Sequence, residues 1–219
     1  MAPFPPKAPV TSEPHHELAL LYAWRGGDRR AGDELMRAYY PQVLGFFRLR
    51  APEVADDLTQ RTFLACTEGR DRVAGSSFRG YVFGAARKLL YKHLDSTQRD
   101  TRLADFRAGQ PQSLLTPSRV VALRQEHWLL LRALERLPLE QQVLLGLHYV
   151  HGLLVREIGE AMDVPVSTVT TRLARARQAL KDQVDTLKAP TRVREALAAD
   201  LDTWTRSLGP LAAHVPAAR

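Results

Sequence analysis

Hydrophobic residues recur along this chain at intervals of three and four, the spacing that gathers side chains on one face of an α-helix. The clearest pattern lies between residues 167 and 184, and its apolar stripe consists of Val169, Leu173, Ala176 and Leu180. A stripe of this kind needs a core to pack against. We therefore expect one amphipathic helix here, with one face buried and the other exposed.

The face opposite this stripe carries hydroxyl, amide and guanidinium groups, and no carboxylate occurs between Val164 and Lys181. Its members are Ser167, Thr171, Ala174, Arg175 and Gln178, flanked by Thr168, Arg172 and Arg177. In a DNA major groove, arginine pairs with guanine edges and glutamine with adenine, and a face without carboxylates is not repelled by the phosphates. The pattern predicts a DNA-reading helix.

A shorter helical pattern, from Val155 to Met162, precedes this helix and is ended by Pro165. The hydroxyl groups of Ser167 or Thr168 could then cap the free amides of the longer helix. A helix, a short turn and a polar-faced helix together indicate a helix-turn-helix. The alternative is a plain helical hairpin whose basic face is only solvated.

The other patterns are helical as well. Residues 15–50 predict two helices joined by the Gly-Gly-Asp turn at 26–28, with a kink expected at Pro41. Residues 52–69 predict a helix with acids in its first turn, and 78–95 predict another. Neither strand-length alternation nor an internal repeat occurs in the sequence, so the expected fold class is all-α.

The helix predicted over 78–95 carries a tyrosine among three cations on its outward side. The four residues are Arg87, Lys88, Tyr91 and Lys92. This combination suits backbone phosphates beside an unstacked base, because aromatic stacking contributes about 1–3 kcal/mol per base. The alternative is a basic face that only extends its charges into solvent.

Composition favours a nucleic-acid partner over catalysis. The net charge is +7 and the sequence pI is about 9.9, which suits a polyanion. The sequence contains neither a phosphate-binding glycine loop nor a nucleophile elbow, and His148 and His151 have no further ligand nearby to complete a metal site. We therefore expect no cofactor, no metal and no catalytic centre. The single Cys66 and the lack of a membrane-spanning apolar run suggest a cytoplasmic protein.

Shifts in composition divide the chain into segments. We expect a disordered, proline-rich lead at 1–14, a helical domain at 15–98, a flexible linker at 99–118, a helix-turn-helix domain at 119–187 and an extension at 188–219. In the extension, apolar residues recur at helical spacing. This amphipathic helix is expected to pack on one of the two domains, where it either modulates promoter access and partner binding or only covers apolar surface.

Several stretches, in this order, resemble the conserved regions of bacterial sigma factors of the extracytoplasmic-function type. They are residues 27–47, 55–69, 78–94 and 134–180. Sigma factors direct core RNA polymerase to promoters and aid promoter melting. The resemblance therefore implies two partners, core polymerase (through its β′ clamp helices and β flap) and promoter DNA. Factors of this type are often held by anti-sigma proteins, so an anti-sigma protein is a candidate third partner.

The resemblance also implies roles for individual positions. Residues expected to grip the clamp helices are Asp56, Asp57, Leu58, Gln60 and Phe63. Residues expected to face the minus-ten element are Arg87, Lys88, Tyr91 and Lys92. Residues expected to face the minus-thirty-five element are Ser167, Thr168, Thr171, Arg172, Arg175 and Gln178.

The chain departs from the family pattern at several positions. Lys88 stands where asparagine is frequent, which changes the expected minus-ten base preference, and Asp163 stands where glycine is usual. Aspartate adopts a left-handed backbone more readily than most residues, so the turn is expected to survive. Two rival readings remain: a free-standing helix-turn-helix repressor that needs no polymerase, and a helical nucleic-acid enzyme, which would need a carboxylate cluster for metal.

Overall fold

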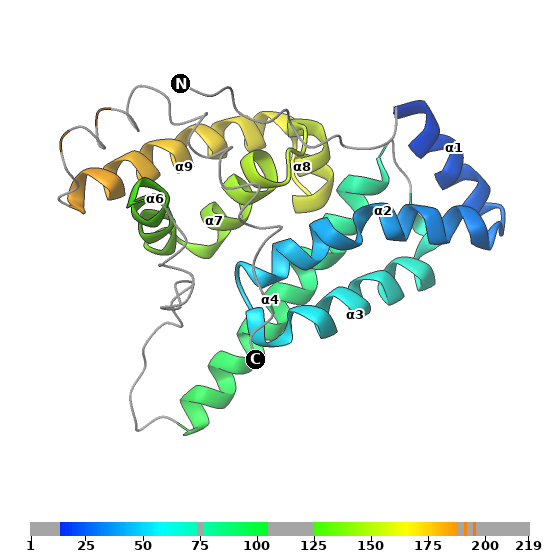
Figure 1. Cartoon of the computed structure of the whole chain (residues 1–219), viewed down its shortest axis with the longest axis horizontal. Helices are drawn as coiled ribbons and strands as arrows, with labels where there is room; N and C mark the ends of the chain where they lie inside the picture. Colours follow the sequence, from blue (N-terminus) through cyan, green and yellow to red (C-terminus); the bar gives the residue numbers. More distant parts are fainter. Residues whose placement is uncertain (1–13, 74–76, 105–124, 188–190, 192–194, 196–219) are drawn as a thin grey trace.

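The computed structural model describes residues 14–73, 77–104 and 125–187, together with positions 191 and 195. Every regular element in these ranges is a helix, which confirms the all-α class (Figure 1). Nearly all of the expected lead and extension, and most of the expected linker, lie outside the described residues. Helix α4 continues to Ala104, so the segment expected to be a linker from residue 99 begins as helix.

The N-terminal module, residues 14–104, contains four α-helices and two short 3₁₀ turns. They are α1 (Pro14–Arg25), α2 (Arg29–Arg48), η1 (Pro52–Val54), α3 (Ala55–Glu68), η2 (Arg70–Arg72) and α4 (Phe78–Ala104). The predicted turn between α1 and α2 is confirmed: Gly27 has φ 101°, and the Asp28 carboxylate accepts from the amide of Arg30 at 2.9 Å. This bond satisfies one of the free amides at the start of α2.

Aromatic side chains fill the core of the N-terminal module. Phe46, Phe47, Phe78 and Phe83 are among its largest fully buried side chains. The Trp24 ring meets Phe78 edge-on with centroids 5.6 Å apart, an arrangement that aromatic quadrupoles favour. Three aromatics of α2 are therefore part of this core, namely Tyr39, Phe46 and Phe47.

The C-terminal module, residues 125–187, ends in the predicted helix-turn-helix. Its elements are α6 (Gln125–Glu135), α7 (Leu139–Leu145), the π-helical turn η3 (Gly146–Val150), α8 (Val155–Met162) and α9 (Val166–Thr186). Asp163 ends α8 in the left-handed conformation, with φ 57° and ψ 48°, as expected of an aspartate in this place. All four residues of the predicted apolar stripe in α9 are buried.

One local prediction about α9 is wrong. Neither Ser167 nor Thr168 caps the helix, because its N-cap residue is Pro165 and no side chain bonds the free amides there. Both hydroxyl residues already lie inside the first turn. The main-chain oxygen of Ser167 instead accepts from the Thr171 hydroxyl at 3.0 Å.

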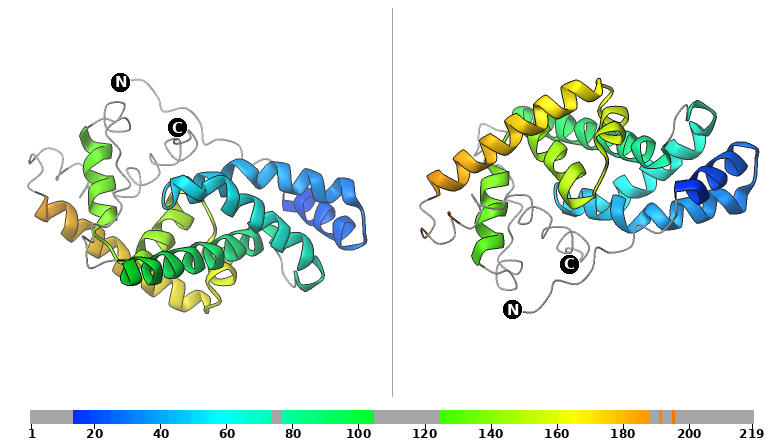
Figure 2. Two further views of the ribbon diagram at one scale, coloured as in Figure 1. Left: turned by 90° about the horizontal axis from the view of Figure 1, so that it is seen from below. Right: turned by 90° about the horizontal axis from the view of Figure 1, so that it is seen from above.

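The two modules pack against each other along α4 and α8 (Figures 1 and 2). Among the described elements, no other pair makes a more extensive contact. The sequence predicts two tethered domains but not this direct packing. The contact determines which predicted DNA-binding residues are exposed.

Candidate nucleic-acid interface

The outward face of α9 presents the groups expected to read DNA. Ser167, Thr171, Arg175 and Gln178 are all exposed, while the stripe on the opposite side of the helix is buried. The Gln178 amide donates to the Asp182 carboxylate at 2.9 Å, which orients the amide along the helix. The face therefore combines a solvent-accessible guanidinium with adaptable hydroxyl and amide groups, on a helix anchored by its buried side.

Residues on the two sides of this face are partly buried or bonded to neighbouring side chains. Arg172 is ion-paired with Glu140 of α7, and Thr168 is half-buried. Arg177, one turn further along α9, donates to the hydroxyl of Tyr149 and lies over its ring at 5.4 Å from the centroid. Arg175 thus lies between two arginines whose side chains are already held by the protein.

The basic set predicted on α4 divides into two pairs. Lys88 and Lys92 are exposed, whereas Arg87 and Tyr91 are half-buried. The Arg87 Nε donates to the main-chain oxygen of Ala161 in α8 at 3.0 Å, and its guanidinium lies over the Tyr91 ring at 5.6 Å from the centroid. Burial raises the pKa of the Tyr91 phenol. Half of this predicted DNA-binding face is therefore covered by the C-terminal module.

The set predicted to contact polymerase on α3 also divides. Asp56, Asp57 and Gln60 are exposed, but Leu58 and Phe63 belong to the core, with exposed fractions of 1% and 8%. A side chain buried to this extent cannot contact a partner without local unfolding. Leu58 and Phe63 thus pack in the core and hold α3 in place, and a polymerase contact through them stays a prediction.

Two exposed residues beside this surface are absent from the predicted set. Leu64, on α3, is 58% exposed, and Tyr40, on α2, is 38% exposed and stacks on Phe63 with ring centroids 6.0 Å apart. The sequence could have indicated Leu64 as an exposed contact residue, because it is apolar and lies outside the inner stripe of its predicted helix, which consists of Val54, Leu58, Thr62 and Ala65.

The remaining candidate groups are placed as follows. Cys66 is buried, which raises the pKa of its thiol to about 12. His148 contacts the main-chain oxygen of Leu153 at 3.2 Å, whereas His151 lies against the rings of Phe46 and Phe83, so the two histidines have different surroundings. In the described ranges, His, Cys, Asp and Glu side chains form no group of three that could hold a metal ion, and no helix is long and apolar enough to cross a membrane.

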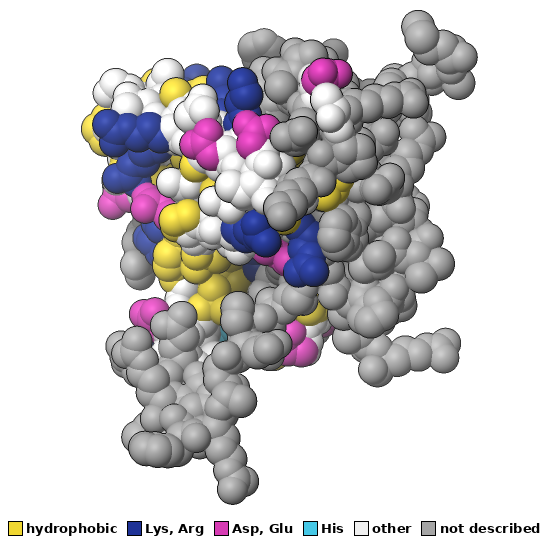
Figure 3. Space-filling view, turned by 90° about the vertical axis from the view of Figure 1, so that its left-hand side faces the viewer, with side chains coloured by type: hydrophobic (Ala, Val, Ile, Leu, Met, Phe, Trp, Pro, Cys, Tyr) yellow, Lys and Arg dark blue, Asp and Glu magenta, His cyan; other side chains and the backbone are white. Residues whose placement is uncertain are grey.

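Basic and hydrophobic side chains share the end of the molecule where α6 and α9 lie. Figure 3 views the molecule from the left-hand side of Figure 1 and shows separate groups of lysine and arginine around a hydrophobic area. A helix-turn-helix whose exposed reading face carries no carboxylate from Val166 to Leu180, joined to a second helical module with its own basic helix, defines a two-module DNA-binding protein.

Two segments of the chain match models of known protein families. Residues 35–100 match the model for sigma-70 region 2, and residues 127–180 match the model for sigma-70 region 4. Together the two segments cover more than half of the chain. The chain belongs to the sigma-70 family of RNA polymerase sigma factors, as a factor of the extracytoplasmic-function type that directs promoter-specific initiation of transcription.

Individual relatives agree with this assignment. The chain is 25% identical over 187 residues to the ECF RNA polymerase sigma-E factors of Salmonella typhimurium and Escherichia coli K12, an alignment that covers 80% of this chain and 98% of each relative. It is also 25% identical to the RNA polymerase sigma-H factor of Pseudomonas aeruginosa over 166 residues, or 70% of this chain and 86% of that protein.

Two solved structures share the fold. One is the sigma factor RpoE in complex with the anti-sigma factor NepR from Bartonella quintana, with a TM-score of 0.52, 18% identity, and coverage of 78% of this chain and 95% of that one. The other is CnrH in complex with the cytosolic domain of CnrY, with a TM-score of 0.54, 21% identity, and coverage of 78% and 98%.

Proposed function

We propose that the two modules recognise two separate promoter elements, the C-terminal module through α9 and the N-terminal module through α4. The observation that supports this best is the exposed face of α9, which carries no carboxylate from Val166 to Leu180, in a helix-turn-helix whose opposite stripe is fully packed. Each surface alone is small. Linking them through polymerase raises the effective concentration of the second element once the first is bound.

In this proposal, α9 enters the major groove of the minus-thirty-five element. Arg175 makes the principal base contact, since its guanidinium is exposed and free to pair in a fork with guanine. Ser167, Thr171 and Gln178 contribute hydroxyl and amide contacts on the same face. Arg172 joins them when its ion pair with Glu140 is exchanged for a phosphate or a base edge.

The α4 helix binds the minus-ten strand and aids promoter melting. Lys88 and Lys92 attract its phosphates, and Tyr91 offers a ring on which an unpaired base can stack. Arg87 completes this set on the same side of the helix. Because Arg87 is bonded to the C-terminal module and Tyr91 beside it is half-buried, strand binding by this pair requires the modules to separate.

Core polymerase docks on the exposed side of α3. The Asp56 and Asp57 carboxylates and the Gln60 amide supply charged and polar contacts for the β′ clamp helices, and Leu64 with Tyr40 supplies an apolar anchor beside them. The β flap is the corresponding partner of the C-terminal module. We assign this factor to the cytoplasm, where its polymerase works, and assign it no catalytic activity of its own.

Capture of core polymerase tests the docking surface. Asp57 forms only an exposed ion pair with Arg61 at 3.3 Å, with side chains 61% and 49% exposed, so Asp57→Ala is expected to leave the fold intact. The variant should lose core polymerase in a pull-down, while Asp95→Ala, an exposed acid on α4, should retain it. Equal capture of both variants would refute the assignment of this surface.

An anti-sigma protein is a further partner in the proposal. One structural neighbour is a sigma factor solved with the anti-sigma factor NepR, and the other is CnrH solved with the cytosolic domain of CnrY. A protein that binds across both modules would hold α4 and α9 away from promoter DNA. Co-purification from the native host, followed by identification of the bound protein, tests this element.

A further inference from the structure

Three arginines of the N-terminal module bond to main-chain oxygens of the C-terminal module. Arg50 Nη2 donates to Gln142 at 3.1 Å, and Arg87 Nε donates to Ala161 at 3.0 Å. The third, Arg79, donates through Nη1 to Gly152 at 3.3 Å and through Nη2 to His151. Carbonyl groups at and just beyond helix ends lack N–H donors within the helix and carry partial negative charge, so they attract guanidinium groups. The Gln142 carbonyl differs, because it also accepts from the Gly146 amide.

Glycines allow the two modules to approach this closely. A Cβ atom at Gly80 would lie 2.7 Å from a carboxylate oxygen of Glu160, and one at Gly84 would lie 3.3 Å from both Cα and O of Ala161. Gly80 and Gly84 are one helical turn apart on α4 and face α8. Their lack of side chains lets the backbones of the two helices pack together, and any larger residue would act as a wedge.

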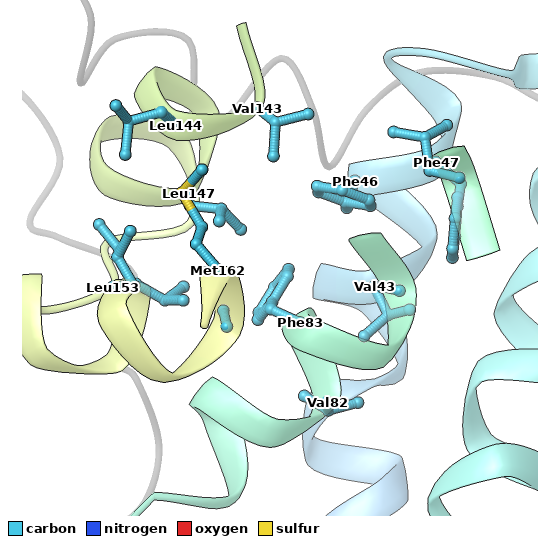
Figure 4. Close-up of a cluster of buried hydrophobic side chains, with 14 of the residues drawn as sticks. Val43, Phe46, Phe47, Val82, Phe83, Val143, Leu144, Leu147, Leu153 and Met162 are labelled. Carbon is cyan, nitrogen blue, oxygen red and sulfur yellow. The ribbon is translucent and has the colours of Figure 1, made fainter. Parts of the chain in front are cut away.

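A continuous apolar cluster joins the modules. Phe46 and Phe83 point from α2 and α4 toward Leu147 and Met162 of the C-terminal module (Figure 4). The His151 ring lies between the modules, with its centroid 4.9 Å from Phe83 and 5.8 Å from Phe46. All of these side chains are buried, so separating the modules exposes apolar surface to water and has a free-energy cost.

Two arginines at this interface keep a donor atom without a hydrogen-bond partner. Arg50 is half-buried, and desolvation lowers the pKa of its guanidinium to about 10. Buried Nε atoms of Arg50 and Arg79 have no hydrogen-bond partner among the described residues. Neutral carbonyl groups therefore satisfy these cations only in part, and an anion with several oxygens would satisfy them better.

We propose that the packing of α8 on α4 is a self-occluded state of the free factor, in which carbonyl groups of the C-terminal module hold arginines that bind phosphates of the promoter strand once the modules separate. The proposal rests on the proposed role of α4. It adds Arg79, a residue outside the predicted site, to the strand-binding set. The reading face of α9 stays exposed in this state, so the occlusion acts on the α4 surface.

Wedge substitutions test the occlusion. Gly84→Leu and Ala161→Leu place a large side chain into the helix contact from opposite modules, and Ser96→Leu, at an exposed position of α4, is the matched control. In small-angle X-ray scattering, both wedge variants should show a larger radius of gyration than the wild type and the control. Because the wedges lie in different modules, damage to one module cannot explain the same result in both. If circular dichroism shows that one variant loses helix, the other decides.

Strand binding without polymerase tests the consequence. The probe is a fluorescein-labelled oligothymidine of about 20 nucleotides, long enough for a strand-binding groove. Each wedge variant should bind it at least about tenfold more tightly than the wild type, as expected when a rare open state becomes the main one. Adding Arg79→Ala to Gly84→Leu should keep the expanded radius but remove most of the gain.

The outcomes distinguish the self-occluded state from the proposed docking role. Unchanged scattering in both wedge variants, or unchanged oligothymidine affinity in expanded variants, would overturn the self-occluded state. A gain that survives Arg79→Ala would overturn the exchange of arginine partners. Failure of the wild type to capture core polymerase would instead overturn the proposed docking role and leave the scattering result standing.

Discussion

Arg172, on the flank of the reading face, is ion-paired with Glu140, which lies on a different helix of the same module. DNA binding through Arg172 requires this pair to be exchanged. Both side chains are about half exposed, 40% and 54%, so the pair contributes at most about 1 kcal/mol after solvent screening. The Glu140 carboxylate therefore competes with DNA for Arg172, but the ion pair is weak enough for DNA to displace it.

Glu140→Gln should therefore strengthen binding of the C-terminal reading face to duplex DNA. We expect a gain of up to about fivefold, from the released guanidinium and the loss of one carboxylate near the phosphates. Fluorescence anisotropy with a minus-thirty-five duplex measures the effect. Asp185→Asn removes one carboxylate at an exposed position near the end of α9 and is the matched control. An equal gain in the control would show that net charge, rather than the pair, is responsible.

Arg175→Ala should weaken binding to the minus-thirty-five duplex by about 1–3 kcal/mol, the usual loss for a fork-like base contact. The loss should depend on the sequence of the element, because the guanidinium pairs with a base. Lys181→Ala, further along the same helix, should instead weaken all duplexes alike. Titrations of matched and scrambled duplexes at fixed salt distinguish the two variants; a loss for Arg175→Ala that ignores sequence would assign it to phosphate.

Leu58 and Leu64, both on α3, should respond in opposite ways to truncation. Leu58 is 1% exposed, so Leu58→Ala should lower the free energy of unfolding by about 2–5 kcal/mol through lost burial and a cavity. Leu64 is 58% exposed, so Leu64→Ala should change it by no more than about 0.5 kcal/mol, yet reduce capture of core polymerase. Urea denaturation and pull-down measure the two effects. Full capture by Leu64→Ala would remove this residue from the docking surface.

The His151 ring makes the module contact sensitive to acid. Burial, with Arg50 and Arg79 close by, lowers the pKa of His151 well below its ordinary 6.5. Glu157 of α8 is buried at the same contact, where it accepts from the Ser77 hydroxyl at 2.8 Å and from the Leu154 amide at 2.8 Å. The neutral imidazole is therefore the form that the packed state accommodates.

The sign of the pH effect follows from this. Because the packed state binds the proton less readily than the unfolded chain, His151 contributes full stability above pH 6.5 and loses it as the pH falls below that value. Between pH 8 and pH 5 the melting temperature of the wild type should fall, and it should fall less in His151→Gln. His148→Gln, which changes the neighbouring histidine, is the control and should behave as the wild type. A fall of the same size in all three proteins would assign the effect to other groups.

Periodicity along the chain was sufficient to predict much of this molecule. The four stripe residues of α9 are buried and Arg175 is exposed, because a helix with one apolar stripe can pack in only one orientation. The left-handed Asp163 followed equally from residue type. Such local features depend on nearby residues, which the sequence displays directly.

The module contact could not be predicted in the same way. The acceptors for Arg79 and Arg87 are main-chain oxygens, which every residue possesses and which therefore leave no mark in the sequence. Gly80 and Gly84 are a local sign of close helix packing, but glycines inside a helix have several other causes. The docking role expected of Leu58 and Phe63 came from the family resemblance, which assigns a segment to docking without stating which of its side chains face outward. Helical spacing alone places Leu58 on the inner stripe of this helix.

Run-off transcription tests the central claim most directly. Core RNA polymerase, with and without this protein, is given a library of bacterial promoter fragments, and the start sites of the transcripts are sequenced. The account predicts that the protein enriches a small set of promoters that share two spaced elements, and that Arg175→Ala weakens this enrichment. Start sites distributed as they are with core polymerase alone would contradict the account.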